Sequence, residues 1–196
     1  LCRHDDLVWY RGAPIEFAEV ASMSMESLAY PFLSEFYSPE ETKRAVRKHL
    51  EGIVTTLAWV ATIDSFQHWI YLNPERTRGE RTAQWLKITK RFGGTTDWTG
   101  LEAEEEALWH RQLHPFEVPF YYVEYGIAQL GALQMWLQYR NDPNAAIALY
   151  KEGLALGASK PLPQLFETCG LRFDFTTQMV GTLMKLVEEE LDKHSE

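Results

Sequence analysis

The sequence predicts an all-α protein of seven to nine helices, and three observations support this prediction. Apolar residues recur at intervals of three or four along most of the chain, which is the spacing of one helix face. No stretch of useful length alternates apolar and polar residues as a strand would. No block repeats at about 33 to 47 residues, which excludes a helical repeat protein. The expected architecture is therefore a multi-helix lobe.

Proline, glycine and capping residues predict where the helices begin and end. Ser38-Pro39-Glu40-Glu41, for example, combines a capping serine, a first-turn proline and acidic residues at the positive helix end. The second half of the helix that follows is apolar nearly all round, so we expect it in the core. Helices are expected over residues 14–35, 39–72, 77–92, 101–114, 119–139, 145–156, 161–169 and 176–193.

The composition is that of an ordinary globular domain. The 196 residues, 45% of them hydrophobic and 24% charged, are enough to bury a core in one domain or one compact lobe. The formal net charge is −9, and no stripe of lysine and arginine carries regularly spaced aromatic residues. Nucleic acid is therefore not an expected partner.

The cysteines and the hydropathy pattern predict a cytoplasmic protein. Cys2 and Cys169 lie far apart and form no Cys-x-x-Cys pair, so neither a disulfide framework nor a cysteine zinc site is expected. No signal peptide and no apolar run long enough to span a membrane is present, so no membrane partner is expected. The start at Leu1 rather than Met indicates a processed or trimmed chain.

The segment Pro14–Glu26 places acids in an otherwise apolar helix. Glu19 and Glu26 are seven residues apart, two helical turns, and therefore project from the same face. Because the surrounding residues are apolar, we expect this helix to be largely buried. A buried carboxylate is costly unless a cation meets it, so the partner is expected to be Arg, Lys, His or a metal ion.

This segment resembles the one that follows the His-Glu-x-x-His helix in oligoendopeptidase F and its thimet oligopeptidase relatives. The resemblance implies that Glu19 is the third zinc ligand and that Glu26 orients a ligand imidazole. No His-Glu-x-x-His occurs in the chain. The resemblance therefore implies that residues 1–196 are the C-terminal part of the helical catalytic domain of a zincin-type oligopeptidase. On spacing alone, a salt bridge from Glu19 to Arg or Lys is the more frequent arrangement.

Residues 109–126 carry a second group of functional candidates. His110 and His114 have the spacing of a helical metal-binding pair, but Arg111 occupies the position of a peptidase's general-base Glu. Pro115 would also distort the last helical turn that aligns the two imidazoles. The pair is therefore not interpreted as a peptidase zinc motif.

The same stretch resembles the His-then-Pro-Phe-Tyr segment of oligoendopeptidase F-like enzymes. The resemblance implies that His114 and one tyrosine donate hydrogen bonds to the substrate carbonyl and to the oxyanion. Tyr125 is the favoured tyrosine, Tyr121 is next and Tyr122 is the least favoured. For any single tyrosine, core packing with a bonded hydroxyl is an equally good interpretation.

Two functions are compatible with these observations. The first is a zinc-dependent peptidase lobe that acts on oligopeptides and needs an N-terminal part to supply the histidines and the general base. This chain alone is then expected to be inactive. The second is a non-catalytic helical protein-interaction module. A di-iron bundle is excluded, because no Glu lies three residues before any of the six histidines.

Overall fold

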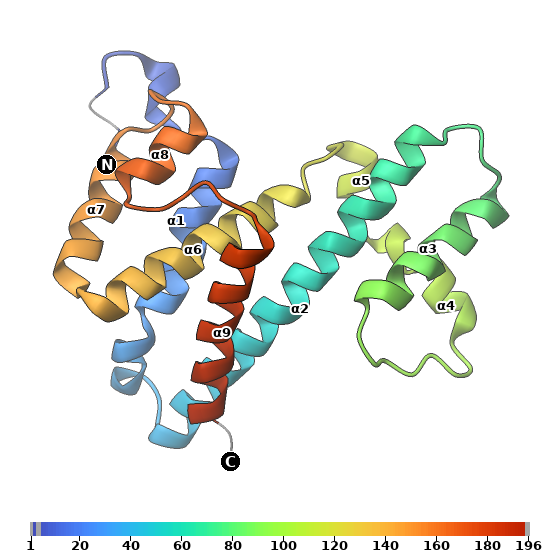
Figure 1. Ribbon diagram of the computed structural model, residues 1–196, viewed down its shortest axis with the longest axis horizontal. Coiled ribbons are helices and arrows are strands. Elements are labelled where there is room, and N and C mark those ends of the chain that lie inside the picture. The colour runs from blue at the N-terminus through green and yellow to red at the C-terminus, as the bar shows by residue number, and fades with distance from the viewer. Residues whose placement is uncertain (1, 3–4, 195–196) are drawn as a thin grey trace. The chain divides into compact units, whose positions relative to one another are not determined.

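The computed structural model describes residue 2 and residues 5–194, and the regular structure in them is entirely helical (Figure 1). The all-α prediction is confirmed. Short 3-10 helices cover Val8–Arg11, Tyr30–Glu35 and Leu108–Arg111. The α-helices are α1 Ile15–Leu28, α2 Pro39–Leu72, α3 Arg78–Phe92, α4 Glu102–Ala107, α5 His114–Glu117, α6 Val123–Asn141, α7 Pro143–Ala155, α8 Leu162–Thr168 and α9 Thr177–Lys193.

Three predicted helices differ from the observed ones. The helix predicted over 14–35 ends at Leu28, and a 3-10 segment with Pro31 in its first turn follows, because proline cannot continue an α-helix. The helix predicted from residue 119 begins only at Val123, since Phe120 has a φ of 63°. The helix predicted over 101–114 ends at Ala107 and continues as a 3-10 turn.

The chain divides into two compact units. One contains residues 1–53 and 127–196, and the other contains residues 54–126. The expected single compact lobe is therefore observed as two units. That residues 1–196 belong to one catalytic domain stays a prediction.

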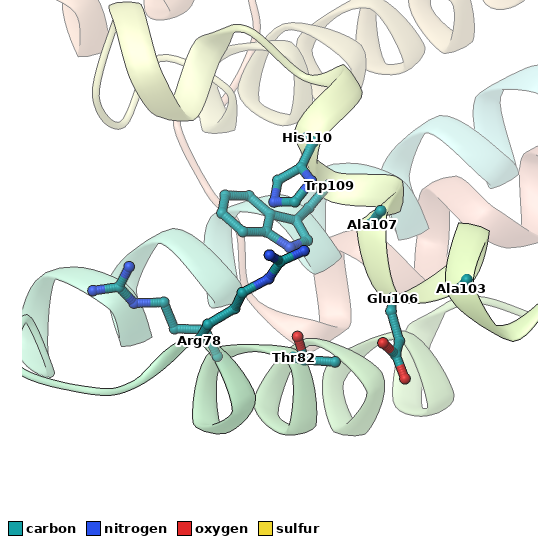
Figure 2. Close-up of a pocket in the computed structure, with 8 residues that line it drawn as sticks. Arg78, Thr82, Ala103, Glu106, Ala107, Trp109 and His110 are labelled. Carbon is teal, nitrogen blue, oxygen red and sulfur yellow. The ribbon is translucent and has the colours of Figure 1, made fainter.

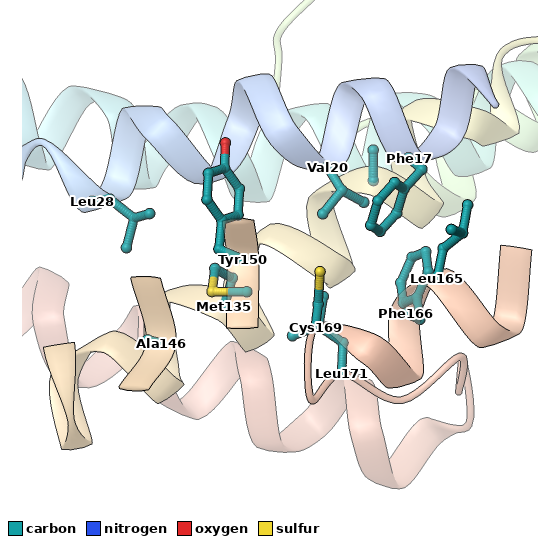
Figure 3. Close-up of a cluster of buried hydrophobic side chains, with 11 residues drawn as sticks. Phe17, Val20, Leu28, Met135, Ala146, Tyr150, Leu165, Phe166, Cys169 and Leu171 are labelled. Carbon is teal, nitrogen blue, oxygen red and sulfur yellow. The ribbon is translucent and has the colours of Figure 1, made fainter. Parts of the chain in front are cut away.

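The first unit is built around the apolar face of α1. Figure 3 shows Phe17 and Val20 pointing from α1 toward Phe166 and Cys169. The rings of Phe17 and Phe166 lie 6.0 Å apart, and both side chains are fully buried. The Tyr150 hydroxyl donates a 2.9 Å hydrogen bond to the backbone carbonyl of Ala21. These contacts fix which face of α1 is turned away from the core.

The second unit packs its helices around a cluster of aromatic rings. The ring of Phe66 on α2 lies 5.2 Å from that of Trp85 on α3 and 5.1 Å from that of Trp109. The Trp85 indole N–H donates a 2.8 Å hydrogen bond to the carbonyl of Glu105 on α4. Ile63 on α2 is buried in the same cluster. The expectation that this part of α2 lies in a core is confirmed.

A capping box fixes the start of α3. The backbone N–H of Glu80 donates to the Thr77 hydroxyl, and the Glu80 carboxylate accepts from the backbone N–H of Thr77. The hydrogen bond from the Thr77 backbone N–H, followed by the side-chain bonds from Arg76 and Thr77, lowers the pKa of the Glu80 carboxyl to about 2. Arg76 also pairs with Glu80 at 2.7 Å.

Both cysteines of the chain are free thiols. Cys169 is buried, and burial raises the pKa of its thiol to about 12. Among the described residues, every helix is either too short or too polar to cross a bilayer.

The contact between α7 and α8 provides a test of this packing. A Cβ added at Gly153 would lie 2.1 Å from the Cys169 sulfur. Gly153→Ala should therefore destabilise the protein by about 1 to 3 kcal/mol, the usual cost of overpacking a core. Adding Cys169→Ala removes the clashing sulfur, so the double variant should be more stable than the sum of the single changes predicts. Urea unfolding measures all three variants.

Gly181 on α9 offers a matched control. An added Cβ there meets nothing within 4 Å. Gly181→Ala should raise the free energy of unfolding by about 0.5 to 1 kcal/mol, because alanine favours helix more than glycine does. Similar effects of alanine at Gly153 and Gly181 would contradict the close approach of α7 to Cys169.

Candidate active site

Helix α1 presents Glu19 and Glu26 on the side opposite its buried face. The buried positions of α1 are Phe17, Val20, Ser24, Ser27 and Leu28. Glu19 is half-buried, whereas the Glu26 side chain is 58% exposed. The expectation that this helix is largely buried is therefore wrong for its acidic face, because the core covers only one side of α1.

Glu19 carries a carboxylate that no described cation neutralises. Its Oε2 accepts a 2.9 Å hydrogen bond from the Ser22 hydroxyl, one turn further along α1. The ion pairs formed within residue 2 and residues 5–194 all involve other acids. The salt bridge from Glu19 to Arg or Lys, the more frequent arrangement on spacing alone, is thus not formed there. Its carboxylate remains available to a cation.

Glu26 ends a chain of three hydrogen-bonded side chains. His49 Nε2 on α2 lies 2.8 Å from Glu26 Oε2, and His49 Nδ1 is bonded to the Tyr30 hydroxyl. Burial raises the pKa of Tyr30, so its phenol stays protonated and donates to Nδ1. The Nε2–H of His49 donates to the Glu26 carboxylate, which can only accept.

His49 and Tyr30 carry no signal in the sequence that links them to Glu26. His49 lies 23 residues from Glu26, in the polar first half of α2, and no local spacing connects them. The ring of Tyr30 packs edge-on against Trp136 at 5.5 Å. Only the packing of α1, α2 and α6 brings these residues to Glu26.

The described residues do not form a complete metal site. No group of three or more His, Cys, Asp or Glu that could hold a metal occurs in the part of the chain that the structure describes. A catalytic zinc site needs three protein ligands and an open position. Glu19 fits as one of the three, because it is half-buried and meets no competing cation. A zinc site that includes Glu19 would need two further ligands from outside the described residues.

The second group of candidates is an imidazole surrounded by three phenols. The ring of His114 lies 5.6 Å from that of Tyr121, 4.9 Å from Tyr122 and 5.8 Å from Tyr125. The hydroxyl of Tyr125 is 3.3 Å from His114 Nε2. Burial raises the pKa of Tyr122, which keeps that phenol neutral. The structure therefore brings together His114 with both predicted tyrosines, and Tyr125 is bonded to it.

A sharp backbone reversal brings the tyrosines back to His114. His114 begins α5, a single turn, and α6 starts at Val123. Phe120, between them, has a φ of 63°, a conformation that is uncommon for a bulky residue. Its ring packs against His68 at 4.9 Å and against Tyr71 at 5.0 Å, both on α2. These contacts hold the reversal in place.

His114 does not use its full hydrogen-bonding capacity. Its Nδ1 is buried and has no hydrogen-bond partner among the described residues. A buried polar atom without a partner is uncommon and often marks a functional position. His110 lies on a different helix from His114, and its ring packs at a tilt against that of Trp109 with ring centres 4.1 Å apart. The two histidines therefore do not form a helical metal-binding pair.

The predicted site residues fall into the two compact units. Glu19 and Glu26 belong to residues 1–53, and His114, Tyr121 and Tyr125 belong to residues 54–126. That the two groups serve one active site stays a prediction.

The comparison with protein families decides how this chain is classified. The sequence model of Peptidase family M3 matches residues 3–184, nearly the whole chain. The chain belongs to Peptidase family M3. This confirms the family that the segments around Glu19 and His114 resemble.

Solved structures support the same classification of this family M3 chain. A protein assigned as an oligoendopeptidase F is 32% identical, with a TM-score of 0.89 over 97% of this chain and 34% of that chain. PZ peptidase A, solved with an inhibitor, is 29% identical to this chain, with a TM-score of 0.89. The match covers 98% of this chain and 35% of PZ peptidase A. A protein from Bacillus anthracis str. Ames, also assigned as an oligoendopeptidase F, is 27% identical, with a TM-score of 0.78. The match covers 98% of this chain and 31% of the Bacillus anthracis protein.

The chain thus spans about a third of the length of the solved structures that it matches. None of the curated proteins compared with the chain matches it.

The bond between His114 and Tyr125 can be tested in the 196-residue chain. Tyr125→Phe removes the hydroxyl and keeps the ring, so it should change the tautomer balance of His114 and lower stability by about 0.5 to 1.5 kcal/mol. Nitrogen-15 NMR of the imidazole reports the tautomer directly. Tyr122→Phe is the matched control, because its ring also contacts His114. Unchanged His114 shifts in Tyr125→Phe would show that this bond does not exist in solution.

Proposed function

We propose that residues 1–196 form the C-terminal part of the catalytic domain of a zinc metalloendopeptidase that hydrolyses short peptides. The match to Peptidase family M3 over residues 3–184 carries this proposal. The names of the similar solved structures, oligoendopeptidase F and PZ peptidase A, support an oligopeptide as the substrate. The roles of individual residues follow from their chemistry and surroundings.

Glu19 is proposed as the one zinc ligand that this chain supplies. A carboxylate that is half-buried and meets no described cation suits a metal ligand better than a structural salt bridge does. When bound, zinc supplies Lewis-acid polarisation of the peptide carbonyl and of the attacking water. Two histidines and a general-base glutamate would come from a His-Glu-x-x-His helix upstream of Leu1, which makes that N-terminal part a required partner.

Glu26 is proposed to orient one of those histidines. Its Oε2 already accepts a hydrogen bond from His49, and an exposed carboxylate has further lone pairs for a second N–H. A carboxylate that accepts from a ligand imidazole fixes the ring and its tautomer. His49 and Tyr30 would keep the Glu26 side chain in one rotamer for this task.

His114 and Tyr125 are proposed as the donors that stabilise the oxyanion. The Tyr125 phenol and the His114 imidazole can each donate to the oxygen that becomes negative as water adds to the peptide carbonyl, and both do so once the hydrogen bond between them opens. Removing one such donor typically costs about 3 to 4 kcal/mol in the transition state. Tyr121 stays the second choice, because its ring also contacts His114.

A cytoplasmic location is proposed as well. Both cysteines are free thiols. This chemistry suits a reducing compartment.

The longer chain that carries the upstream helix tests the residue roles. Glu19→Gln should abolish stoichiometric zinc binding and cleavage of a fluorogenic oligopeptide, since one of three protein ligands is lost. Glu26→Gln should weaken zinc affinity by about 10- to 100-fold. Glu16→Gln on the same helix is the matched control and should change neither. Full zinc content and full activity in Glu19→Gln would show that Glu19 is not a zinc ligand, whereas a longer chain without any activity would favour the alternative of a non-catalytic helical module.

The oxyanion donors are tested in the same longer chain. Tyr125→Phe should lower kcat by about 100- to 1000-fold while the zinc content stays unchanged. Tyr122→Phe should have little effect on kcat or on the zinc content. If Tyr121→Phe produces the loss instead, the assignment of Tyr125 is wrong.

The 196-residue chain by itself should neither bind zinc tightly nor cleave the same peptide, because it supplies a single ligand and no general base. Inductively coupled plasma mass spectrometry of the purified chain and a peptidase assay with added zinc check this expectation. Rapid cleavage by this chain would contradict the proposed division of ligands.

A further inference from the structure

The unit of residues 54–126 contains a cavity of about 520 Å³ that the proposed peptidase roles do not use. Figure 2 shows Trp109 and His110 facing α3, which carries Arg78 and Thr82, while Glu106 comes from α4. Arg81 also lines the cavity. His114, Tyr121 and Tyr125 are not among its lining residues, so the cavity is distinct from the imidazole–phenol cluster.

Two guanidinium groups at this cavity lack an acidic partner. Among the described residues, neither Arg78 nor Arg81 forms an ion pair. The neighbouring Arg76, in contrast, is paired with Glu80 at 2.7 Å. Two cations thus face a single acid, Glu106, across the cavity. This excess of positive charge favours an anionic ligand.

Arg81 provides independent evidence for a ligand. One of its terminal nitrogens, Nη2, donates a 3.1 Å hydrogen bond to the carbonyl of Pro74. Its Nε, however, is buried and has no hydrogen-bond partner within the described residues. Leaving a charged donor unpaired costs free energy, and an anion in the cavity can accept from the terminal nitrogens of this guanidinium, whereas Nε itself is closed to the cavity.

The remaining walls of the cavity favour an organic anion over an inorganic one. Trp109, Ala103 and Ala107 supply apolar surface. The Trp109 ring is held in place by Phe66 at 5.1 Å and by Phe116, which stacks on it at 5.4 Å. A flat, fixed indole beside two guanidinium groups suits a carboxylate with an apolar body. The Thr82 hydroxyl offers a further donor.

We propose that this cavity binds an organic carboxylate, with the carboxylate on Arg78 and Arg81 and the apolar body against Trp109. The carboxylate can belong to a free small acid or to the C-terminus of a peptide. The recognition chemistry is the same in both cases. This proposal is independent of the proposed peptidase activity, because it requires neither zinc nor the upstream helix.

Calorimetric titration of the 196-residue chain tests the site with four probes: benzoate, N-acetyl-phenylalanine, its uncharged amide and inorganic phosphate. Both carboxylates should bind at least about tenfold more tightly than the amide and phosphate, because the charge and the apolar body are both recognised. Tighter binding of benzoate would identify a free acid as the ligand, and tighter binding of N-acetyl-phenylalanine would identify a peptide C-terminus. Binding of the amide or of phosphate as tightly as the carboxylates would overturn the proposal.

Substitutions locate the binding. Arg81→Gln and Arg78→Gln should each weaken carboxylate binding by about tenfold or more, since a charge-assisted hydrogen bond is lost. Lys90→Gln is the matched control, because Lys90 is exposed on the same helix and does not line the cavity. Equal carboxylate affinity in Arg81→Gln and in the unchanged chain would overturn the proposal.

A measurement on the unchanged chain keeps the test independent of variant folding. Nitrogen-15 NMR of the arginine Nε–H groups should show the Arg81 signal shifting as carboxylate is added, with the Arg76 signal as an internal reference. An Arg81 Nε–H signal that does not move at saturating carboxylate would also overturn the proposal.

Discussion

The packing of one face of α1 is the constraint on which the acidic part of the candidate site depends. Phe17 and Val20 are buried against Phe166 and Cys169, so the opposite face of α1 must point away from the core. Glu19 therefore stays on that opposite face and cannot turn inward without moving a fully buried phenylalanine. Burial of the apolar face of α1, worth about 25 cal/mol per Å², thus determines where the Glu19 side chain points.

The imidazole–phenol cluster depends on a different constraint, a strained backbone. Phe120 has a φ of 63°, and this turn places Tyr121 and Tyr125 beside His114. Such a conformation costs of order 1 to 3 kcal/mol in a residue other than glycine. The contacts of the Phe120 ring with His68 and Tyr71 offset part of that cost. The donors are therefore positioned by aromatic packing.

The sequence predicts the helices well because their ends carry local signals. Pro39, Pro143 and the Thr77 cap mark starts that the structure confirms to within a residue or two. The sequence does not predict the local structure where tertiary packing determines the backbone conformation. Phe120 is an example, because no neighbouring residue signals its conformation. The link from Glu26 to His49 is hidden for the same reason, since it spans 23 residues and two helices.

The two proposed groups of site residues differ chemically, and each suits a different role under the proposed function. Residues 1–53 contribute carboxylates, which suit a cation. Residues 54–126 contribute a phenol and an imidazole, which can donate hydrogen bonds while neutral and so suit an oxygen that gains negative charge. Each group therefore suits the role proposed for it, although residues 1–53 also contain a phenol and an imidazole, those of Tyr30 and His49.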